Sequence, residues 1–453
     1  MNPQLPPVRG AAGYVLAAVV ILVFVVLIIG AGFMSLAGYE TRNTQQDLDG
    51  QRAFWLAEGA RERAIRWITQ QSRPPESDVP IYQSMAGPDG GTYTVDCRVD
   101  TTALYQVEKA FVLDCVGQYR GRDRRIRDRV RMTSFAQFAY FTDNEVAPGG
   151  STIWFATGDL IGGRLHTNGT IHILGNPRFI EGVTSASDHM IGYQNFWIGE
   201  PSDWPAGSNH PTFDQGFTLD APEVELPTRT LDLRQEALAG GVYIGPEAEL
   251  ELGVMGSPAG VSAPGWFRHR NLSPPNDPWT SVRITTLASR VLYCNNDLHV
   301  KGVLDGELTV ASNRSVRIED DLTYLASDAQ GAPRPGCDDL LGIVAGENII
   351  LVNNAANRTN LIIDGVLMAL NTSITAQDYN SGSLRGVLTI WGGLIQKYRG
   401  AVGTVNNGAI VTGYRKDYHY DARVTAHTPP AFPLTGVYEE VTWTETWDDS
   451  DPF

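Results

Sequence analysis

Hydrophobic residues dominate the start of the chain, without a charge among them. No charged residue lies between Arg9 and Glu40, and nearly every residue from Ala11 to Ala37 is apolar. A helix needs about 20 apolar residues to cross about 30 Å of hydrocarbon, and this run is longer. The apolar core of a cleaved secretory signal has only about 7–15 residues. The pattern therefore predicts one membrane-spanning helix, with its N-terminus inside and more than 400 residues exported.

A second, amphipathic pattern follows the apolar run. Apolar residues recur at steps of three and four, which is typical of one helix face: Ala53, Leu56, Ala57, Ala60, Ala64, Trp67 and Ile68. Glu58 with Arg61, and Glu62 with Arg66, are spaced for ion pairs on the other face. Pro74-Pro75 ends the run. We predict one continuous helix whose first half lies in lipid and whose second half packs on a soluble domain.

Three β-rich runs follow this helix. Residues 92–99, 110–119 and 125–133 predict an antiparallel meander. In the third run, arginines at odd positions alternate with apolar residues, which predicts a solvated face that also carries Asp123 and Asp128. An acidic partner subunit or lipid headgroups are the alternative explanation of this basic patch.

The chain has four cysteines, and none lies in a Cys-x-x-Cys pair: Cys97, Cys115, Cys294 and Cys337. If the first two runs pair about a turn near Tyr105-Gln106, Cys97 and Cys115 lie near each other and become a candidate disulfide. Buried free thiols are the alternative.

The pattern changes at about Ser134. Short β runs are separated by Gly, Asn and Asp, and similar segments begin at Gly342, Gly365 and Gly393, spaced 23 and 28 residues apart. Such a period, with continuous apolar triplets, is typical of strands stacked in parallel. We expect a protein that is mainly β with a long N-terminal helix, and in which a small antiparallel sheet precedes a right-handed parallel β-helix. A β-sandwich is the alternative.

The predicted organisation has five parts, and the C-terminal part holds an edge strand followed by a frayed acidic end. They are a leader (1–13), a transmembrane and amphipathic helix (14–72), a small antiparallel sheet (73–133), a β-solenoid head (134–427) and an acidic tail (428–453).

Composition and motifs narrow the function. A net charge of −16 argues against a nucleic-acid partner. The acidic groups of the head, Glu319-Asp320-Asp321 and Asp338-Asp339, are adjacent on the chain and form a weak basis for glycosidase chemistry. His166 and His172 lack a nearby carboxylate or thiol, so turn hydrogen bonding is favoured over metal binding. We predict no enzyme activity, no cofactor and no metal.

The N-terminal region resembles the class III signal and first helix of type IV pilins. More narrowly, the sequence Ala53-Phe-Trp-Leu-Ala-Glu-Gly-Ala60 resembles the Ala-Phe-x-x-Ala-Glu-Ala-Gly stretch of PilX-type minor pilins, with the last two residues swapped. An ordinary signal anchor with a helical stalk is the alternative. The resemblance implies cleavage by prepilin peptidase after Gly10 or Gly13. The fifth mature residue would then be Val15 or Ala18, where major pilins carry a Glu.

A second resemblance covers the start of the head. Three segments resemble an uncharacterised domain that follows pilin-like N-termini in bacterial proteins: Phe138–Asp143, Gly163–Gly169 and Pro177–Phe179. This resemblance implies no activity.

The resemblances together imply a minor pilin-like or pseudopilin-like component of a type IV pilus or a type II secretion-type assembly. Its head would be bulky and exported from the bacterial inner membrane, at the filament tip or flank. The implied partners are other pilin-like subunits, prepilin peptidase, the inner-membrane assembly platform and membrane lipid. The alternative function is a membrane-anchored carbohydrate-binding or carbohydrate-active β-helix protein.

Overall fold

The computed structural model describes residues 11–70, 75, 77–100, 110–192, 196–200, 203–204, 210–254, 262–275, 277–406 and 409–446. The chain forms two compact units. The first comprises residues 1–100, 110–131 and 440–453, and the second comprises residues 101–109 and 132–439. The predicted cleavage position Gly10 lies outside the described residues.

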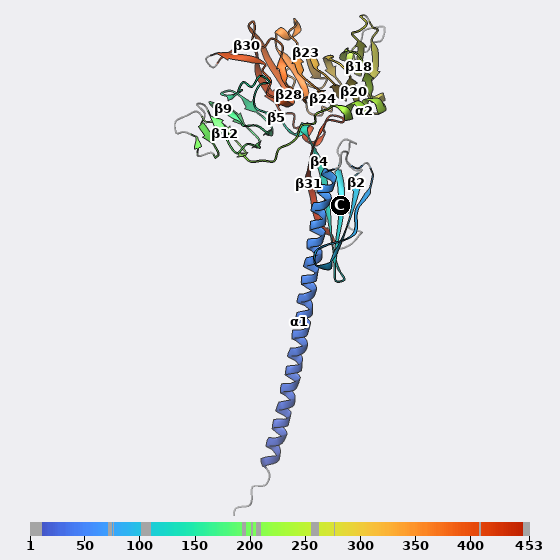
Figure 1. The fold of residues 1–453 in the computed structure, drawn as a ribbon, viewed down its shortest axis with the longest axis vertical. Helices are drawn as coiled ribbons and strands as arrows, with labels where there is room; N and C mark the ends of the chain where they lie inside the picture. The colour runs from blue at the N-terminus through green and yellow to red at the C-terminus, as the bar shows by residue number, and fades with distance from the viewer. Residues whose placement is uncertain are drawn as a thin grey trace, which may run out of the picture. The chain divides into compact units, whose positions relative to one another are not determined.

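One long helix, α1 (Ala11–Thr69), begins the first unit (Figure 1). Its 59 residues correspond to a length of about 90 Å. Every residue from 14 to 48 is exposed, and the most apolar window has a mean hydropathy of 3.2. By length and composition, α1 is therefore long and apolar enough to cross a membrane.

The second half of α1 packs on a five-stranded antiparallel sheet, in which the strand order is β1-β2-β3-β4-β31. The strands are β1 (Val79–Ala86), β2 (Thr92–Val99), β3 (Ala110–Tyr119), β4 (Arg122–Ser134) and β31 (Leu434–Thr446). The three predicted runs correspond to β2, β3 and β4. Both edge strands lie outside the predicted meander. The C-terminal β31 corresponds to the edge strand that was predicted in the acidic tail, whereas β1 was not predicted.

Small residues allow α1 to lie close to the sheet. Ala53, Ala57 and Ala60 are fully buried, as the predicted stripe requires. A Cβ at Gly117 of β3 would lie 2.0 Å from the Ala53 carbonyl oxygen and 2.5 Å from the Ala57 nitrogen. Gly117 therefore fits because it has no side chain, and the backbones of helix and strand are in direct contact.

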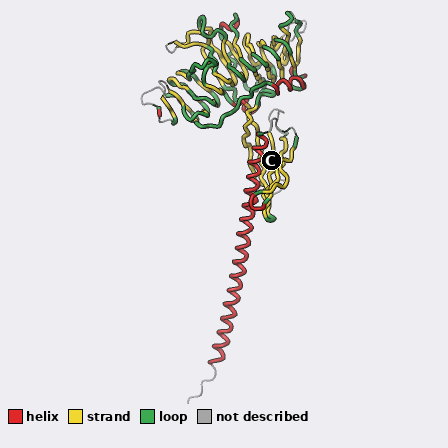
Figure 2. The backbone as a smooth tube through the Cα atoms, in the orientation of Figure 1, coloured by secondary structure: helices red, strands yellow, loops and turns green. Residues whose placement is uncertain are grey.

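The second unit, the head, is built mainly from strands and loops (Figure 2). Its first ladder pairs strands in parallel, in the stacking order β15 (Phe217–Thr218), β11 (Val183–Ser185), β8 (Leu165–Thr167), β5 (Tyr140–Asn144), β28 (Leu384–Tyr398), β26 (Leu361–Ala369), β24 (Leu340–Ala345), β22 (Glu307–Ser312), β20 (Val291–Cys294) and β16 (Val242–Ile244). A second parallel ladder has the order β17 (Ala248–Val254), β21 (Leu298–Leu304), β23 (Val316–Tyr324), β25 (Ile349–Leu351) and β27 (Ile374–Ala376).

Shorter elements complete the head. Antiparallel pairs join β18 (Ser262–Asn271) to β17 and β19 (Thr280–Arg283), and β29 (Gly403–Asn406) to β30 (Ala409–His419), which also pairs in parallel with β28. Two small sheets contain β7 (Leu160–Ile161), β10 (Arg178–Phe179) and β14 (Thr212–Phe213), and β6 (Phe155–Ala156), β9 (His172–Leu174), β12 (Met190–Gly192) and β13 (Phe196–Ile198). The remaining α-helices of the described chain are α2 (Leu231–Gly240) and α3 (Arg423–Ala426).

The similar segments predicted from the sequence are neighbours in the first ladder, with a register that differs by one residue. Gly342 pairs with Val366, and Val366 pairs with Gly393, so Gly365 is not in line with the other two glycines. The stacking order also departs from the chain order, because β28 lies between β26 and the first strand of the head, β5.

The coarse fold prediction is confirmed: the protein is mainly β, with a long apolar N-terminal helix and a small antiparallel sheet. The ladders of the head pair their strands mostly in parallel, whereas a β-sandwich is built from antiparallel sheets. The right-handed parallel β-helix remains a prediction.

Replacing Gly117 by Ala should loosen the first unit. The added Cβ overlaps the α1 backbone, so α1 must move away from β3, at a cost of about 1–3 kcal/mol. Hydrogen exchange of the β3 amides in the detergent-solubilised full chain should become faster. Gly59→Ala is the control, since Gly59 lies on α1 with nothing within 4 Å of an added Cβ. Unchanged β3 exchange in Gly117→Ala would contradict the close contact.

Candidate functional sites

The first half of α1 presents apolar side chains on all sides. Phe24 is 64% exposed, and its neighbours from Tyr14 to Ile29 are exposed as well. A continuous apolar surface of this size requires lipid or partner helices around it. Gly13, Val15 and Ala18, which the pilin resemblance singled out, lie on this segment of the helix.

A buried ion pair fixes the second half of α1 to the sheet. Arg61 Nη1 donates to Asp128 Oδ2 on β4 at 2.8 Å, and the Asp128 side chain is fully buried. The same guanidinium contacts Glu58 at 2.8 Å, Glu62 at 2.6 Å and Glu440 of β31 at 2.9 Å. Arg61 therefore connects α1, β4 and β31 through one side chain.

The burial of this pair changes the proton affinity of both groups. Burial raises the pKa of Asp128, although the hydrogen bond from Arg61 acts in the opposite direction. Burial by itself would lower the pKa of Arg61, but its hydrogen bonds to Asp128 and Glu58 raise the pKa above its usual value.

The sequence interpretation of Asp128 was wrong. We expected Asp128 on the solvated arginine face, but it shares the strand parity of Ile126 and Val130 and lies under α1 with them. The arginines form ion pairs on the other face: Arg127 Nε lies 2.6 Å from Asp114, and Arg129 Nε lies 2.5 Å from Asp100.

The candidate disulfide between Cys97 and Cys115 is not formed in the structure, and both thiols are free and buried. Cys97 pairs with Leu113, and Cys115 pairs with Val95, so the two cysteines are diagonal neighbours rather than opposed. Burial raises the pKa of Cys97 to about 12, and burial also raises the pKa of Cys115, so both are held as neutral thiols.

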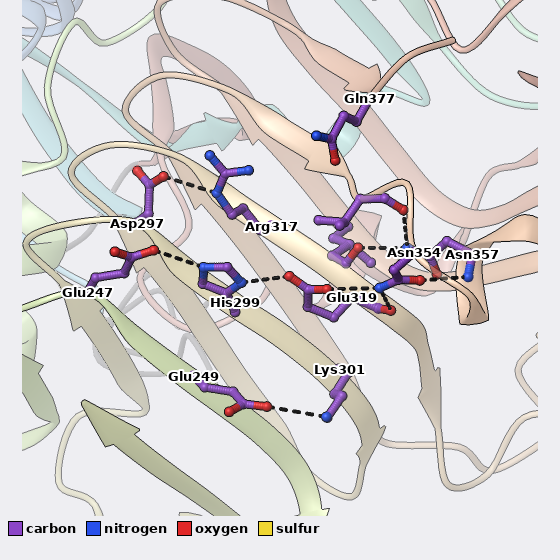
Figure 3. Close-up of polar contacts among 12 residues, drawn as sticks. Glu247, Glu249, Asp297, His299, Lys301, Arg317, Glu319, Asn354, Asn357 and Gln377 are labelled. Atoms are coloured by element: carbon purple, nitrogen blue, oxygen red, sulfur yellow. Dashed lines mark hydrogen bonds and ion pairs between the residues drawn. The ribbon is translucent and has the colours of Figure 1, made fainter. Parts of the chain in front are cut away.

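A row of polar side chains crosses neighbouring strands of the head (Figure 3). His299 of β21 contacts Glu319 of β23 through Nδ1 at 2.6 Å and Glu247 through Nε2 at 3.0 Å. Glu319 in turn accepts a hydrogen bond from Asn354 Nδ2 at 2.9 Å, and Asp297 accepts one from Arg317 at 3.1 Å. This row holds adjacent strands in register.

The other acidic candidates of the head also have local partners. Asp339 is buried and accepts backbone N–H groups from Gly306 at 2.6 Å and from Ala326 at 3.1 Å. Asp321 accepts the N–H of Ile362 at 2.8 Å, and burial raises the pKa of its carboxyl. Asp320 accepts the N–H of Asp321 at 2.9 Å.

The two histidines considered as metal ligands contact different residues. His166 is buried, with its ring nitrogens 2.7 Å from Thr184 Oγ1 and 3.1 Å from Asn168 Oδ1, while His172 lies edge-on to Trp154. Burial lowers the pKa of both imidazoles. Within the described ranges, no group of three or more His, Cys, Asp or Glu side chains could hold a metal ion.

Several buried charged residues of the head were not predicted from the sequence, among them Asp364 and the pair Arg399–Glu145. Asp364 of β26 is fully buried and accepts the N–H of Tyr324 at 2.8 Å. Arg399 is 3% exposed and pairs with Glu145 at 3.0 Å, just after the paired strands β28 and β5. A single charged residue within a strand, such as Asp364, or just after one, such as Arg399, gives no pattern that would have marked its position.

Comparisons with known proteins found similarity to one family model, over a short part of the chain, and to solved structures. A family model described as a domain of unknown function (DUF4900) matches residues 111–187, from β3 into the first strands of the head. No curated protein matches the chain. Among solved structures, the competence-associated pilin ComZ from Thermus thermophilus aligns over 88% of this chain and 97% of its own, with 13% identity and a TM-score of 0.34.

Replacing Asp128 by Ala should destabilise the first unit by about 1.5–3 kcal/mol, because it removes the charge-assisted hydrogen bond inside the interface. Arg61 then keeps only its contacts with the more exposed carboxylates of Glu58, Glu62 and Glu440. Denaturant unfolding of the detergent-solubilised full chain, followed by fluorescence, measures the effect. Asp123→Ala is the control on the same strand, since Asp123 is exposed. Equal midpoints for the two variants would show that the pair does not anchor the helix.

The stability of the head should depend on pH through Asp364. Burial raises the pKa of Asp364 to about 7, above the value of about 4 expected in the unfolded chain. Between these two pH values the native state binds more protons than the unfolded state. The stability that Asp364 contributes is therefore complete below about pH 4 and is lost as the pH rises through about 7.

Unfolding midpoints at pH 5 and pH 8 test this dependence. Wild type should be more stable at the lower pH, and Asp364→Asn should reduce the difference, while the exposed Asp338→Asn should retain it. An Asp364→Asn variant with the full wild-type difference would assign the dependence to other groups.

Proposed function

We propose that this protein is a minor pilin-like or pseudopilin-like component of a type IV pilus or a type II secretion-type assembly. The observation that carries the proposal is the division of α1 into two environments. Its first half exposes apolar side chains on every side, and its second half is buried against a small antiparallel sheet. Such a helix suits a subunit that is stored in a membrane and then transferred into a bundle of similar helices.

The proposal includes the processing and the partners of this helix. Prepilin peptidase would cut after Gly10 or Gly13, and the inner-membrane platform would move the subunit from lipid into contact with other pilin-like subunits. Val15 or Ala18 would then occupy the fifth mature position, and neither carries a carboxylate that could compensate a neighbouring amine. This favours a minor subunit over the repeating subunit of a filament.

The proposed role of the head is that of a rigid body at the tip or flank. We interpret its parallel ladders as rungs of a right-handed β-helix, an interpretation supported by the in-register pairing of β22, β24 and β26. A head of this bulk does not fit between closely stacked neighbours. Low copy number and an exported position on the bacterial inner membrane follow from the proposal.

The role that we propose is structural rather than enzymatic. In its support, Glu319 is engaged by His299 and Asn354, and Asp339 is engaged by two backbone N–H groups. These contacts support a structural role for Glu319 and Asp339.

Replacing Gly10 and Gly13 together by Leu should block processing. The variant should accumulate as a species about 1 kDa larger than the mature protein and should be lost from sheared surface filaments. Immunoblots of whole cells and of the sheared fraction measure both effects. Gly59→Leu is the matched control, since this exposed glycine of α1 lies far from the cleavage region. Unchanged mobility of the wild-type chain in a strain without prepilin peptidase would reject the proposal.

A further inference from the structure

A cavity of about 210 Å³ lies in the head where β5 meets β28. Much of its lining is apolar or aromatic: Tyr140, Phe155, Ile161, Ile374 and Leu394. An engineered apolar cavity of about 150 Å³ is known to hold benzene. The cavity at this junction is therefore large enough for a six-membered ring with one small substituent.

Two cationic side chains, Arg399 and Lys416, also line this cavity, but one of them is already neutralised. Arg399 pairs with buried Glu145 at 3.0 Å and donates to the carbonyl oxygens of Ile153 at 3.1 Å and Trp154 at 3.2 Å. Its guanidinium also lies 3.9 Å from the centre of the Phe155 ring. Arg399, which follows β28, is therefore bound to Glu145, which follows β5, and few of its N–H groups are left to bind a ligand.

Lys416 of β30 has no such partner. Its side chain is half-buried, and within the described part of the chain its ammonium forms neither an ion pair nor a hydrogen bond. Burial lowers the pKa of Lys416. The nearby carboxylates of Asp159 and Glu145 oppose that change, and the nearby Arg399 guanidinium adds to it. A partly desolvated ammonium without a partner is unfavourable, and a bound anion would relieve this cost.

Hydroxyl donors complete the lining. Tyr418 lines the same cavity. The hydroxyl of Tyr140 is buried near Gln396 and has no well-formed hydrogen bond. An ammonium and two phenols form a set of donors that matches the acceptors of a carboxylate. Two carboxylates, Asp159 and Asp417, also line the cavity, and Asp417 is paired with His419 at 2.9 Å. Because Lys416 is the one unpaired cation among the described lining residues, a dianion such as phosphate would be disfavoured.

We propose that the junction cavity binds a small monocarboxylate with an apolar body, placing the carboxylate on Lys416 and the body against the apolar wall. This site is independent of the role proposed for α1.

Titration calorimetry of the detergent-solubilised full chain with benzoate tests the site, with benzyl alcohol and glucose as uncharged comparisons. Benzoate should bind, and Lys416→Met should weaken binding at least ~10-fold, since a charge-assisted hydrogen bond is lost. Lys397→Met is the control, because Lys397 does not line the cavity. Circular dichroism checks that each variant is folded. If Lys416→Met does not fold, Tyr418→Phe replaces it and should also weaken benzoate binding.

Three results would overturn the proposal. The first is that the wild-type chain does not bind benzoate at about 10 mM. The second is that benzoate binds equally well to Lys397→Met and to the folded cavity variant, Lys416→Met or Tyr418→Phe. The third is that benzyl alcohol or glucose binds as tightly as benzoate.

Discussion

The direct backbone contact between α1 and β3 is the constraint on which the first unit depends. Gly117 gives β3 no side chain at the point of contact, and Ala53 and Ala57 give α1 only methyl groups. Leu56 fills the space beside this contact, where a Cβ at either Gly87 or Gly91 would lie 2.3 Å from a Leu56 methyl carbon. Small residues at these positions set the distance between helix and sheet.

That short distance makes the buried ion pair feasible. An arginine one helical turn beyond Ala57 reaches Asp128 on β4 without leaving the interface, and it also reaches Glu440 of the last strand. Trp443 extends this connection by donating to Glu58 at 3.3 Å. The two ends of the sequence are thus held together in the first unit, and the apolar half of α1 extends from a rigid base.

The sequence predicted those features that local periodicity encodes. The buried stripe on α1 and the bounds of β2 and β3 followed from spacing alone. Strand parity would also have placed Asp128 beside Ile126, had the parity been weighed above its charge. The diagonal positions of Cys97 and Cys115 depend on the register between β2 and β3. A shift of two residues would bring the cysteines opposite each other, and composition does not fix that register.

Long-range pairing was beyond a sequence analysis. The return of β31 to the edge of the N-terminal sheet, and the insertion of β28 between β26 and β5, join segments that are more than 200 residues apart. The Glu145–Arg399 pair and the cavity beside it exist only because of that second junction. Loop closure of this size leaves no periodic signal in the chain.

The proposal on which this account depends is that the exposed half of α1 packs against the helices of pilin-like subunits. Site-specific photo-crosslinking in cells tests this claim most directly, with the photoreactive residue at exposed Phe24 and, for comparison, at exposed Arg66 near the end of α1. The account predicts discrete protein adducts with pilin-like subunits from position 24 and none of these adducts from position 66. Adducts only with lipid at position 24, in cells that assemble filaments, would contradict it.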